Sequence, residues 1–334
     1  MSAGLESTSF GVVVMAASIA ETRAAARRLT LFCGGARLST GPGRPRLKQG
    51  APRPPSRRDV TPHGGTLAGM ELRGRHVVVT GGGSGIGRAL VERFARDAAG
   101  VVVVDCDGAA AAEVADAVGG LAVTADVGSE QEILRVIAEA EGAYGPIDLF
   151  CSNAGLAHPL GGIDADDEGW TRQWNVHVMA HLWAARALVP AMLRRGGGYL
   201  LSTSSAVGLL MVPGALPYTV TKHAALALAE QLAVLYRGTG VRFSCLCPAL
   251  VETPMIEGVG EGAVGRFLRL EGPPMEPAEV ADVVVEGLRE ERFLIFTHPQ
   301  TAAAVRGRAT DPEGYLDAVA AIWAAANAPE GPPA

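Results

Sequence analysis

The sequence is most informative at residues 76–87, which read His76-Val77-Val78-Val79-Thr80-Gly81-Gly82-Gly83-Ser84-Gly85-Ile86-Gly87. An apolar, β-branched run passes directly into a glycine-rich loop, and a helical pattern follows over Gly87–Asp97. Glycines let a backbone approach a pyrophosphate closely, and a helix N-terminus offers that anion free N–H groups. Such a loop is often only a turn, but its place between strand and helix favours dinucleotide binding.

Strand-like and helical patterns alternate along the chain from Glu71 onward. Apolar runs that read as strands occupy His76–Thr80, Val101–Asp105, Leu121–Ala125, Ile147–Ser152, Tyr199–Thr203, Val241–Cys247 and Phe293–Phe296. Helical patterns between them include Gly87–Asp97, Glu130–Glu141, Trp170–Arg195 and Tyr218–Arg237. Near-continuous apolar strands separated by helices indicate a parallel sheet covered on both faces. We therefore predict an α/β fold, a Rossmann-type doubly wound seven-stranded parallel sheet in a single domain.

The second strand ends in Asp105, eighteen residues after Gly87. An acid near that distance is where the adenosine ribose hydroxyls are held, and its charge repels the 2′-phosphate of NADP. Neither Ser84 nor Cys106 supplies the cation that would attract that phosphate. The pattern favours NAD, and the plainer alternative is that Asp105 only caps the end of a strand.

Four motifs in order resemble those of the short-chain dehydrogenase/reductase family. They are Thr80-Gly81-x-x-x-Gly85-Ile86-Gly87, Asn153-Ala154-Gly155, Ser205, and Tyr218-x-x-x-Lys222. The resemblance spans about residues 71–300 and implies hydride transfer between NAD and an alcohol or ketone. Tyr218 and Lys222 stand at i and i+4, on one face of a helix. An ammonium beside a phenol favours phenolate, so we expect Lys222 to lower the pKa of Tyr218 and make it a general acid and base.

The resemblance implies roles for further residues. Ser205 would hydrogen-bond the substrate oxygen, Lys222 would also hold the nicotinamide ribose, and Asn175 would bind a water that carries the proton onward. The expected cofactor contacts are Gly81, Ser84, Gly85, Ile86, Gly87, Asp105, Asp126, Val127, Asn153, Tyr218, Lys222, Pro248, Val251 and Thr253. Ala249 stands where the family usually has glycine, which questions the detailed shape of that loop.

The first 70 residues differ in character from the rest. They hold ten basic residues against three acidic ones, whereas the remainder is acidic and the whole chain carries −6. A stretch rich in proline, glycine and arginine over Gly41–Gly65 predicts disorder. We expect residues 1–69 to be a disordered basic leader or the product of a mis-assigned start, residues 70–300 the NAD-binding catalytic domain, and residues 301–334 a helical tail.

The composition argues against several classes of protein. The acidic body does not favour nucleic acid, and no apolar run reaches the roughly 18 residues of a membrane span. The histidines show no metal-ligand spacing, and we expect His177 and His181 to be packing or pocket-lining residues. The five cysteines, an odd number, read as reduced thiols, mostly buried. Glu6 and the lack of basic residues before the apolar run Gly11–Ala20 count against export, so we expect a cytoplasmic protein.

The partner is expected to be a small hydrophobic alcohol or ketone, because the lid region Pro254–Pro274 is apolar and rich in glycine. Leucines and methionine on more than one face of two helices predict a homodimer or homotetramer. These residues are Leu182, Leu188, Met192, Leu226, Leu228, Leu232 and Leu235. The alternatives are the family's extended branch, which the glycine loop disfavours, and a non-catalytic NAD-binding scaffold. A scaffold would be expected to have lost its Ser-Tyr-Lys set, which is intact here.

Overall fold

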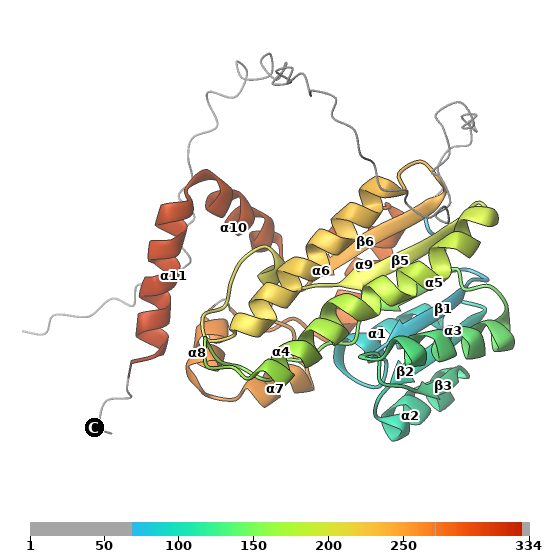
Figure 1. Cartoon of the computed structure of the whole chain (residues 1–334), viewed down its shortest axis with the longest axis horizontal. Helices are drawn as coiled ribbons and strands as arrows, with labels where there is room; N and C mark the ends of the chain where they lie inside the picture. Colours follow the sequence, from blue (N-terminus) through green and yellow to red (C-terminus); the bar gives the residue numbers. More distant parts are fainter. Residues whose placement is uncertain (1–68, 271, 329–334) are drawn as a thin grey trace, which may run out of the picture. The chain divides into compact units, whose positions relative to one another are not determined.

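The computed structural model describes residues 69–270 and 272–328, which fall within one compact unit of the chain. The predicted leader lies outside the described residues. Seven parallel strands form one sheet in the order β3-β2-β1-β4-β5-β6-β7, so the predicted fold class is confirmed (Figure 1). The strands are β1 His76–Thr80, β2 Gly100–Asp105, β3 Leu121–Thr124, β4 Leu149–Ser152, β5 Gly198–Thr203, β6 Val241–Cys247 and β7 Leu294–Phe296.

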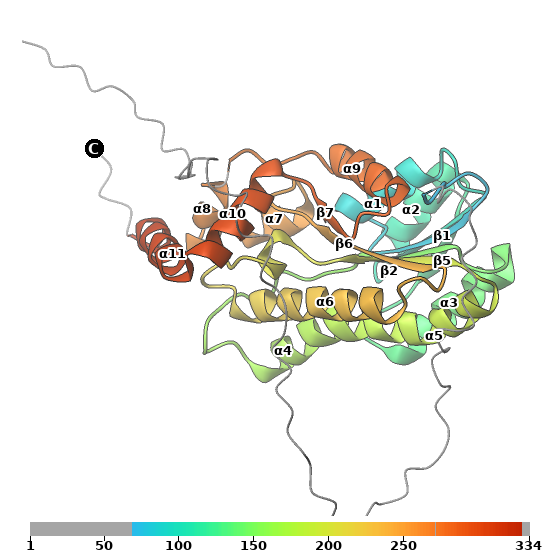
Figure 2. The same ribbon diagram turned by 90° about the horizontal axis from the view of Figure 1, so that it is seen from above.

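Helices cover both faces of the sheet, as Figure 2 shows. One face packs against α1 Gly85–Phe94, α2 Gly108–Val118 and α9 Pro277–Arg289. The other packs against α3 Glu130–Tyr144, α5 Ala180–Arg194 and α6 Leu216–Leu235. Successive side chains of a strand point to opposite faces, so Val77 and Val79 join the first core while Val78 joins the second. Burial on both faces explains why the strands read as unbroken apolar runs.

The long helix predicted over Trp170–Arg195 is three helical segments. They are α4 Asp167–Trp174, the π-helical turn η1 Asn175–Met179, and α5. A π-turn inserts an extra residue and shifts the register of every side chain that follows, which no periodic pattern reveals. The combined segment Asp167–Arg194 has the length and apolar composition to cross a membrane, but 56% of its most apolar window is buried, as in a core helix.

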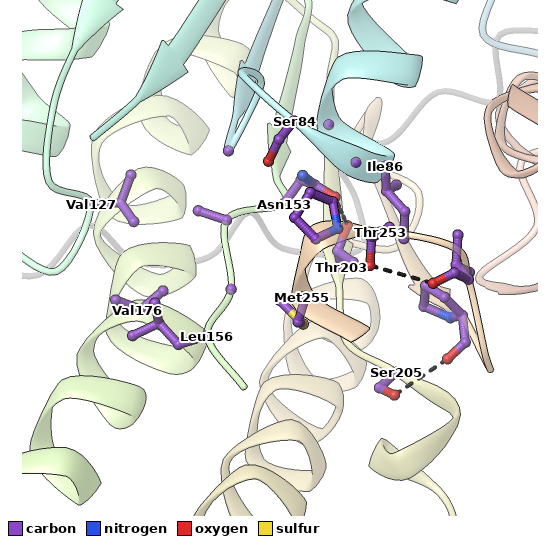
Figure 3. Close-up of a pocket in the computed structure, with 18 of the residues that line it drawn as sticks. Ser84, Ile86, Val127, Asn153, Leu156, Val176, Thr203, Ser205, Thr253 and Met255 are labelled. Atoms are coloured by element: carbon purple, nitrogen blue, oxygen red, sulfur yellow. Dashed lines mark hydrogen bonds between the residues drawn. The ribbon is translucent and has the colours of Figure 1, made fainter. Parts of the chain in front are cut away.

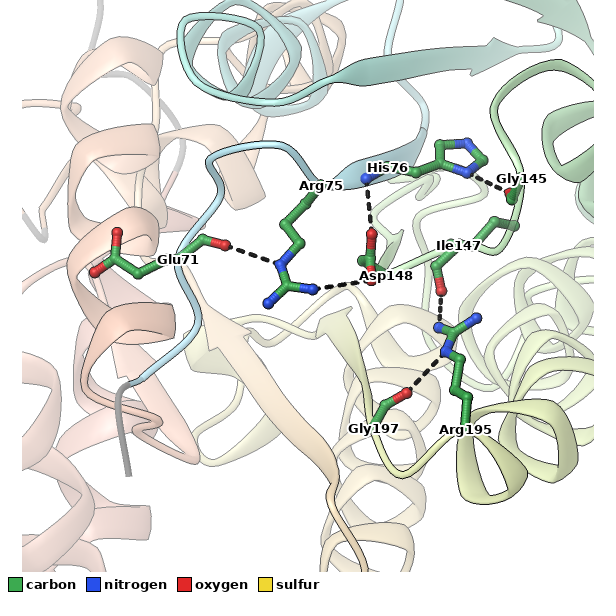
Figure 4. A network of polar contacts seen from close by, with 8 residues as sticks. All are labelled: Glu71, Arg75, His76, Gly145, Ile147, Asp148, Arg195 and Gly197. Atoms are coloured by element: carbon green, nitrogen blue, oxygen red, sulfur yellow. Dashed lines mark hydrogen bonds and ion pairs between the residues drawn. The ribbon is translucent and has the colours of Figure 1, made fainter. Parts of the chain in front are cut away.

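Polar contacts tie together the amino ends of three strands, at the edge opposite the glycine loop (Figure 4). Asp148, just before β4, accepts hydrogen bonds from the backbone N–H of His76 at 3.0 Å and from Arg75 at 3.4 Å. The His76 ring contacts the carbonyl of Gly145, and Arg195 donates to the carbonyls flanking β4 and β5. This edge therefore serves the fold and leaves the opposite edge to the site.

Several of the apolar residues expected at an oligomer interface lie inside the protomer instead. Leu188, Met192 and Leu226 are buried in the core and cannot contact a second copy. The apolar surface that the sequence indicated as excess is buried between these helices and the sheet. At the end of α6, by contrast, Val234 and Leu235 are 70% and 67% exposed.

Four helices and one 3₁₀ turn complete the described part of the chain after β5, in addition to α6 and α9. A 3₁₀ turn η2 at Ala206–Gly208 follows β5, and two short helices, α7 Pro254–Val259 and α8 Ala263–Arg269, form the lid region after β6. After β7 come α10 Pro299–Thr310 and α11 Pro312–Ala326, and α11 packs against α8 (Figures 1 and 2).

Candidate active site

A large cavity opens at the carboxyl ends of the strands, where β1 and β4 lie side by side and their connections diverge. It has a volume of about 1160 Å³, which includes space open to solvent. All fourteen residues expected to contact the cofactor line it, from the glycine loop, the ends of β2 and β3, the loops after β4 and β6, and α6. Of these, Ser84, Ile86, Val127, Asn153 and Thr253 are labelled in Figure 3. Open α/β sheets bind ligands at such a switch point.

The glycine loop has no room for side chains at its critical positions. Gly81 has φ of +65°, and a Cβ there would lie 2.9 Å from the backbone of Ala154. A Cβ on Gly87 would lie 1.8 Å from the carbonyl oxygen of Gly81. The close packing brings the first turn of α1 to the cavity wall, where Ser84, Gly85 and Ile86 line the space. The loop and helix thus fit a pyrophosphate.

Asp105 both ends its strand and faces the cavity. Its carboxylate accepts hydrogen bonds from the backbone N–H of Gly83 at 3.0 Å and of Asp107 at 3.1 Å. The two interpretations of Asp105 are therefore compatible, because a carboxylate has capacity for further donors such as ribose hydroxyls.

Asp126 forms part of an ion pair that sequence reasoning missed. Arg172 of α4 contacts Asp126 at 2.6 Å, and both residues line the cavity. The guanidinium holds the pKa of Asp126 below its usual value. Arg172 lies 46 residues from Asp126 in the chain, so only the fold brings them together.

The hydroxyl of Thr80 and the side chain of Asn153 join three strands beside the cavity. The Thr80 Oγ1 accepts from the N–H groups of Asn153 at 2.9 Å and Ala154 at 3.1 Å, and donates to the carbonyl of Cys151. The Asn153 amide donates to the Thr80 carbonyl at 3.1 Å and accepts from Thr203 Oγ1 at 3.1 Å. Asn153 therefore fixes the relative positions of β1, β4 and β5.

Tyr218 and Lys222 project from one face of α6 into the same cavity, beside Ser205. Lys222 is only 3% exposed, its Nζ donates to the carbonyl of Thr203 at 3.1 Å, and it lies 5.6 Å from the centre of the Tyr218 ring. Ser205 Oγ accepts from the N–H of Val207 and donates to the carbonyl of Pro248 at 3.3 Å. The three side chains that the family motif names are thus brought together.

The electrostatics of this group differ from our expectation. Burial lowers the pKa of Lys222 to about 8. Burial also raises the pKa of Tyr218, although a hydrogen bond with Ser205 opposes the rise. The pKa of Tyr218 is therefore not lowered as we expected, because burial destabilises the phenolate more than the hydrogen bond with Ser205 stabilises it.

The structure does not bring Asn175 into this group. Its half-buried side chain lines neither cavity and makes no hydrogen bond within the described residues. Its backbone carbonyl accepts from Ala180, closing the π-turn. His177, two residues on, is instead fully buried with its ring 5.5 Å from that of Tyr218.

The loop after β6 tolerates Ala249 without strain. Among the described residues, Glu291 is the only non-glycine with positive φ, so Ala249 needs no left-handed backbone. Its N–H donates to Thr297 Oγ1 at 3.2 Å. Pro248, Val251 and Thr253 of this loop all line the cavity.

A second, apolar cavity of about 660 Å³, again including space open to solvent, adjoins the first. Ser205, Tyr218, Ala249, Met255 and Ile256 line both. The rest of its lining is entirely apolar: Ala157, Leu160, Ala206, Val207, Leu210, Met211, Val212, Ala215, Leu250, Val259, Val264 and Leu268. Among residues 69–270 and 272–328, the hydroxyls of Ser205 and Tyr218 are therefore the only side-chain polar groups on its wall.

Helix α11 supports the outer wall of this second cavity. Trp323 packs edge-on against Phe267 of α8 at 6.4 Å and contacts the backbone at Gly214. Arg266 donates to the carbonyl of Ala326, and the Tyr315 hydroxyl accepts from the N–H of Met211. The helical tail thus packs against both segments that enclose the apolar space.

The fold and this site define a nucleotide-dependent oxidoreductase, and comparisons with known proteins agree. The family described as short chain dehydrogenase matches residues 75–263. A 1-deoxy-11-beta-hydroxypentalenate dehydrogenase of Streptomyces exfoliatus is 38% identical over 252 residues, covering 72% of this chain and 90% of that protein. The 17-beta-hydroxysteroid dehydrogenase 13 of Mus musculus is 31% identical, covering 67% and 74%.

Solved structures give the same result. A short chain dehydrogenase/reductase from Burkholderia phymatum in complex with NAD superposes with a TM-score of 0.68 at 29% identity, covering 73% of this chain and 96% of that one. The chain therefore belongs to the short-chain dehydrogenase/reductase family. It is an oxidoreductase that acts on CH–OH groups with NAD as cofactor. The narrow glycine loop, the facing helix N-terminus and Asp105 fit that cofactor.

Replacing Asp105 with serine should weaken NAD binding and reduce the preference of the protein for NAD over NADP. The change removes a charge that repels a 2′-phosphate and an acceptor for ribose hydroxyls. Dissociation constants for both cofactors, measured by fluorescence titration, check this. Asp107→Ser, at the exposed cap of α2, is the matched control. An unchanged ratio of the two constants in Asp105→Ser would contradict the assignment.

The burial of Lys222 should be measurable as pH-dependent stability. In the folded protein the pKa of Lys222 is about 8, whereas in an unfolded chain it has the ordinary value of 10.5. Between these values the unfolded state binds more protons, so stability rises with pH. The free energy of unfolding of wild type minus that of Lys222→Met should therefore increase across this window by on the order of 3 kcal/mol. Denaturant titrations at pH 7, 8, 9 and 10 measure the difference; a flat profile would show that Lys222 is not desolvated.

Proposed function

We propose that the protein catalyses reversible hydride transfer between NAD(H) and a hydrophobic secondary alcohol or ketone. The observation that carries the proposal is the meeting of the two cavities at Tyr218 and Ser205. A substrate in the apolar cavity would place its oxygen at the hydroxyls of Ser205 and Tyr218, directly beside the cofactor space. NAD, when bound, supplies the acceptor or donor of the hydride.

In this proposal Tyr218 moves the proton. During oxidation its phenolate takes the proton of the substrate hydroxyl, and during reduction the phenol returns one. Ser205 holds the same oxygen by a hydrogen bond, which its rotatable hydroxyl permits. At neutral pH Lys222 places a positive charge near the phenol, and its Nζ donates a hydrogen bond to the Thr203 carbonyl.

The raised pKa of Tyr218 sets the direction of the pH dependence. A phenol with a raised pKa is protonated at neutral pH and ready to donate in ketone reduction. Alcohol oxidation needs the phenolate, so its rate should climb as the pH rises toward the Tyr218 pKa. The proposal therefore includes faster oxidation at alkaline than at acid pH.

The substrate is proposed to be a lipophilic ring alcohol without a charged group near the reacting carbon. No charged side chain of the part of the chain that the structure describes lines the apolar cavity, so a carboxylate or phosphate placed there would be desolvated without a partner from these residues. Relatives carry the names hydroxypentalenate dehydrogenase and hydroxysteroid dehydrogenase, which support a hydroxyl on a hydrophobic skeleton.

A non-catalytic NAD-binding scaffold is the alternative. It would not require Ser205 and Tyr218 to line both cavities with Lys222 beside them in the first, which is the arrangement here. We therefore favour the enzyme.

We further propose a homodimer or homotetramer working in the cytoplasm. The exposed Val234 and Leu235 at the end of α6 support an interface there. The four described cysteines are all free thiols, which supports a reducing compartment. The proposal includes no nucleic-acid, membrane or metal partner.

Tyr218→Phe tests the mechanism. The ring and its packing stay while the hydroxyl goes, so the fold and NAD affinity should survive. Turnover should fall by about 10²–10⁴-fold, the usual contribution of a positioned acid or base. NAD reduction with cyclohexanol, borneol and estradiol, and NAD binding measured separately, check this. Turnover close to that of wild type would refute the mechanism.

Trp323→Ala tests the apolar wall. Loss of the indole should loosen α11 on α8 and raise KM for the bulkier alcohols, while KM for NAD and for cyclohexanol changes little. Leu316→Ala, on the exposed side of the same helix at 46% exposure, is the matched control. Equal KM changes for small and bulky alcohols would argue against a role of α11 in the substrate wall.

A further inference from the structure

His177 lies at the junction of the elements that carry the proposed acid and base. It belongs to the π-turn η1, it is fully buried, and its ring stands edge-on to that of Tyr218 at 5.5 Å and 87°. Leu156, which is hydrogen-bonded to His177, lines the cofactor cavity and is labelled in Figure 3. A buried imidazole costs stability unless both of its nitrogens are paired.

Both nitrogens of His177 are paired, and the pairing fixes the proton. The backbone N–H of Leu156 donates to Nε2 at 2.9 Å, so Nε2 carries no proton. The neutral ring must therefore carry its proton on Nδ1, which donates to Thr221 Oγ1 at 2.9 Å. The Thr221 hydroxyl in turn donates to the carbonyl of Pro217 at 2.8 Å.

These bonds form a continuous chain between two parts of the site. One end is the loop 153–156 after β4, which lines the cofactor cavity. The other end is the first two turns of α6, where Tyr218 follows Pro217 and Lys222 follows Thr221. Any tilt of α6 relative to the loop would break at least one bond of the chain.

The surroundings keep the ring neutral. Titratable groups facing this place are Tyr218 and Lys222 from α6, His181 from α5, and Cys245 and Cys247 from β6 beneath Lys222. Burial and the nearby Lys222 hold the pKa of His177 well below its usual value. His181, with neither nitrogen bonded, has its pKa lowered to about 3 and is also uncharged. Lys222 is thus the only cation in the group.

Gly155 of the loop lies close to both Lys222 and His177. A Cβ at that position would lie 3.5 Å from Lys222 Nζ and 3.6 Å from His177 Nε2. The ammonium and the imidazole therefore approach one point on the loop from two helices, and His177 is placed to respond to any movement of Lys222 or of the loop.

We propose that His177 is a positioning residue for this enzyme: a neutral Nδ1–H imidazole that locks the cofactor-lining loop to the catalytic turn of α6 through Leu156 and Thr221. It acts through Tyr218 and Lys222 and does not itself exchange a proton with the substrate. The inference rests on the proposed function of Tyr218. It also accounts for a polar, fully buried side chain where an apolar one would pack at less cost.

Substitutions can break the chain at either end. In His177→Asn the shorter side chain places an amide donor near the position of Nδ1, so the hydrogen bond to Thr221 is kept and the hydrogen bond from Leu156 is lost. In His177→Gln the longer side chain places an amide oxygen near the position of Nε2, so the hydrogen bond from Leu156 is kept and the hydrogen bond to Thr221 is lost. His177→Leu removes both. His76→Leu is the matched control, since His76 is also buried and hydrogen-bonded but lies at the opposite edge of the sheet.

In His177→Leu we expect kcat with the best alcohol of the cyclohexanol, borneol and estradiol panel to fall about 10-fold to 100-fold, as for misplaced catalytic groups. The acid limb of its pH profile should move to higher pH, because an apolar neighbour desolvates Tyr218 further. His177→Asn and His177→Gln should each recover part of the rate. NAD affinity, measured by titration, should fall in His177→Leu and His177→Asn, which release the loop.

A lower melting temperature alone, with kcat and the pH limb as in wild type, would overturn the proposal, and His76→Leu should behave in that way. If His177→Leu does not fold, Thr221→Val decides: a lower kcat that Thr221→Ser recovers supports the proposal, and an unchanged kcat overturns it. The proposed function is tested separately: it fails if the Tyr218→Phe variant turns over alcohols at the rate of wild type.

Discussion

The hydroxyl of Thr80 is the contact on which the rest of the site depends. It satisfies two backbone N–H groups of the loop after β4 and one carbonyl of that strand. Without it, buried donors at the edge of the sheet would lack partners, at a cost of about 1–3 kcal/mol for each unsatisfied group. The loop so held carries Asn153, which spans to β5, and Leu156, which reaches His177. A path of hydrogen bonds and short backbone links therefore runs from the strand that opens the cofactor loop to the helix that presents Tyr218.

Desolvation is the second constraint, and it acts against the charged forms of Tyr218 and Lys222. Lys222 is buried with one carbonyl as its hydrogen-bond partner, and Tyr218 is shielded beside it. A site shaped for stability would place apolar side chains there. The protein tolerates the cost because neutral imidazoles, rather than further cations, surround the ammonium. A dry site also strengthens every electrostatic interaction that develops during proton transfer.

The doubly wound parallel sheet and the residues that line the first cavity could be predicted from the sequence, because they depend on local rules. Apolar strands, the glycine loop and Asp105 carry their meaning in residue type and short spacing. The ion pair of Arg172 with Asp126, and the bond of His177 to Thr221, join residues far apart in the chain and have no local signal. The π-turn at Asn175–Met179 hid the second of these, since helical periodicity gives no warning of an inserted residue. Periodicity likewise assigned Leu188, Met192 and Leu226 to an interface, although the sheet buries them. The Tyr218 pKa was misjudged because a motif shows the nearby charge and not the depth of burial.

The position of α11 against α8 has a consequence for synthesis. Translation delivers the glycine loop, Asp105 and helix α6 first, and Trp323 about a hundred residues after Tyr218. A domain generally folds as a unit. A nascent polypeptide can therefore have released every residue that lines the first cavity while it still lacks α11, the helix that packs against the outer wall of the apolar cavity. The last helix to be synthesised thus completes the apolar cavity and not the cofactor cavity.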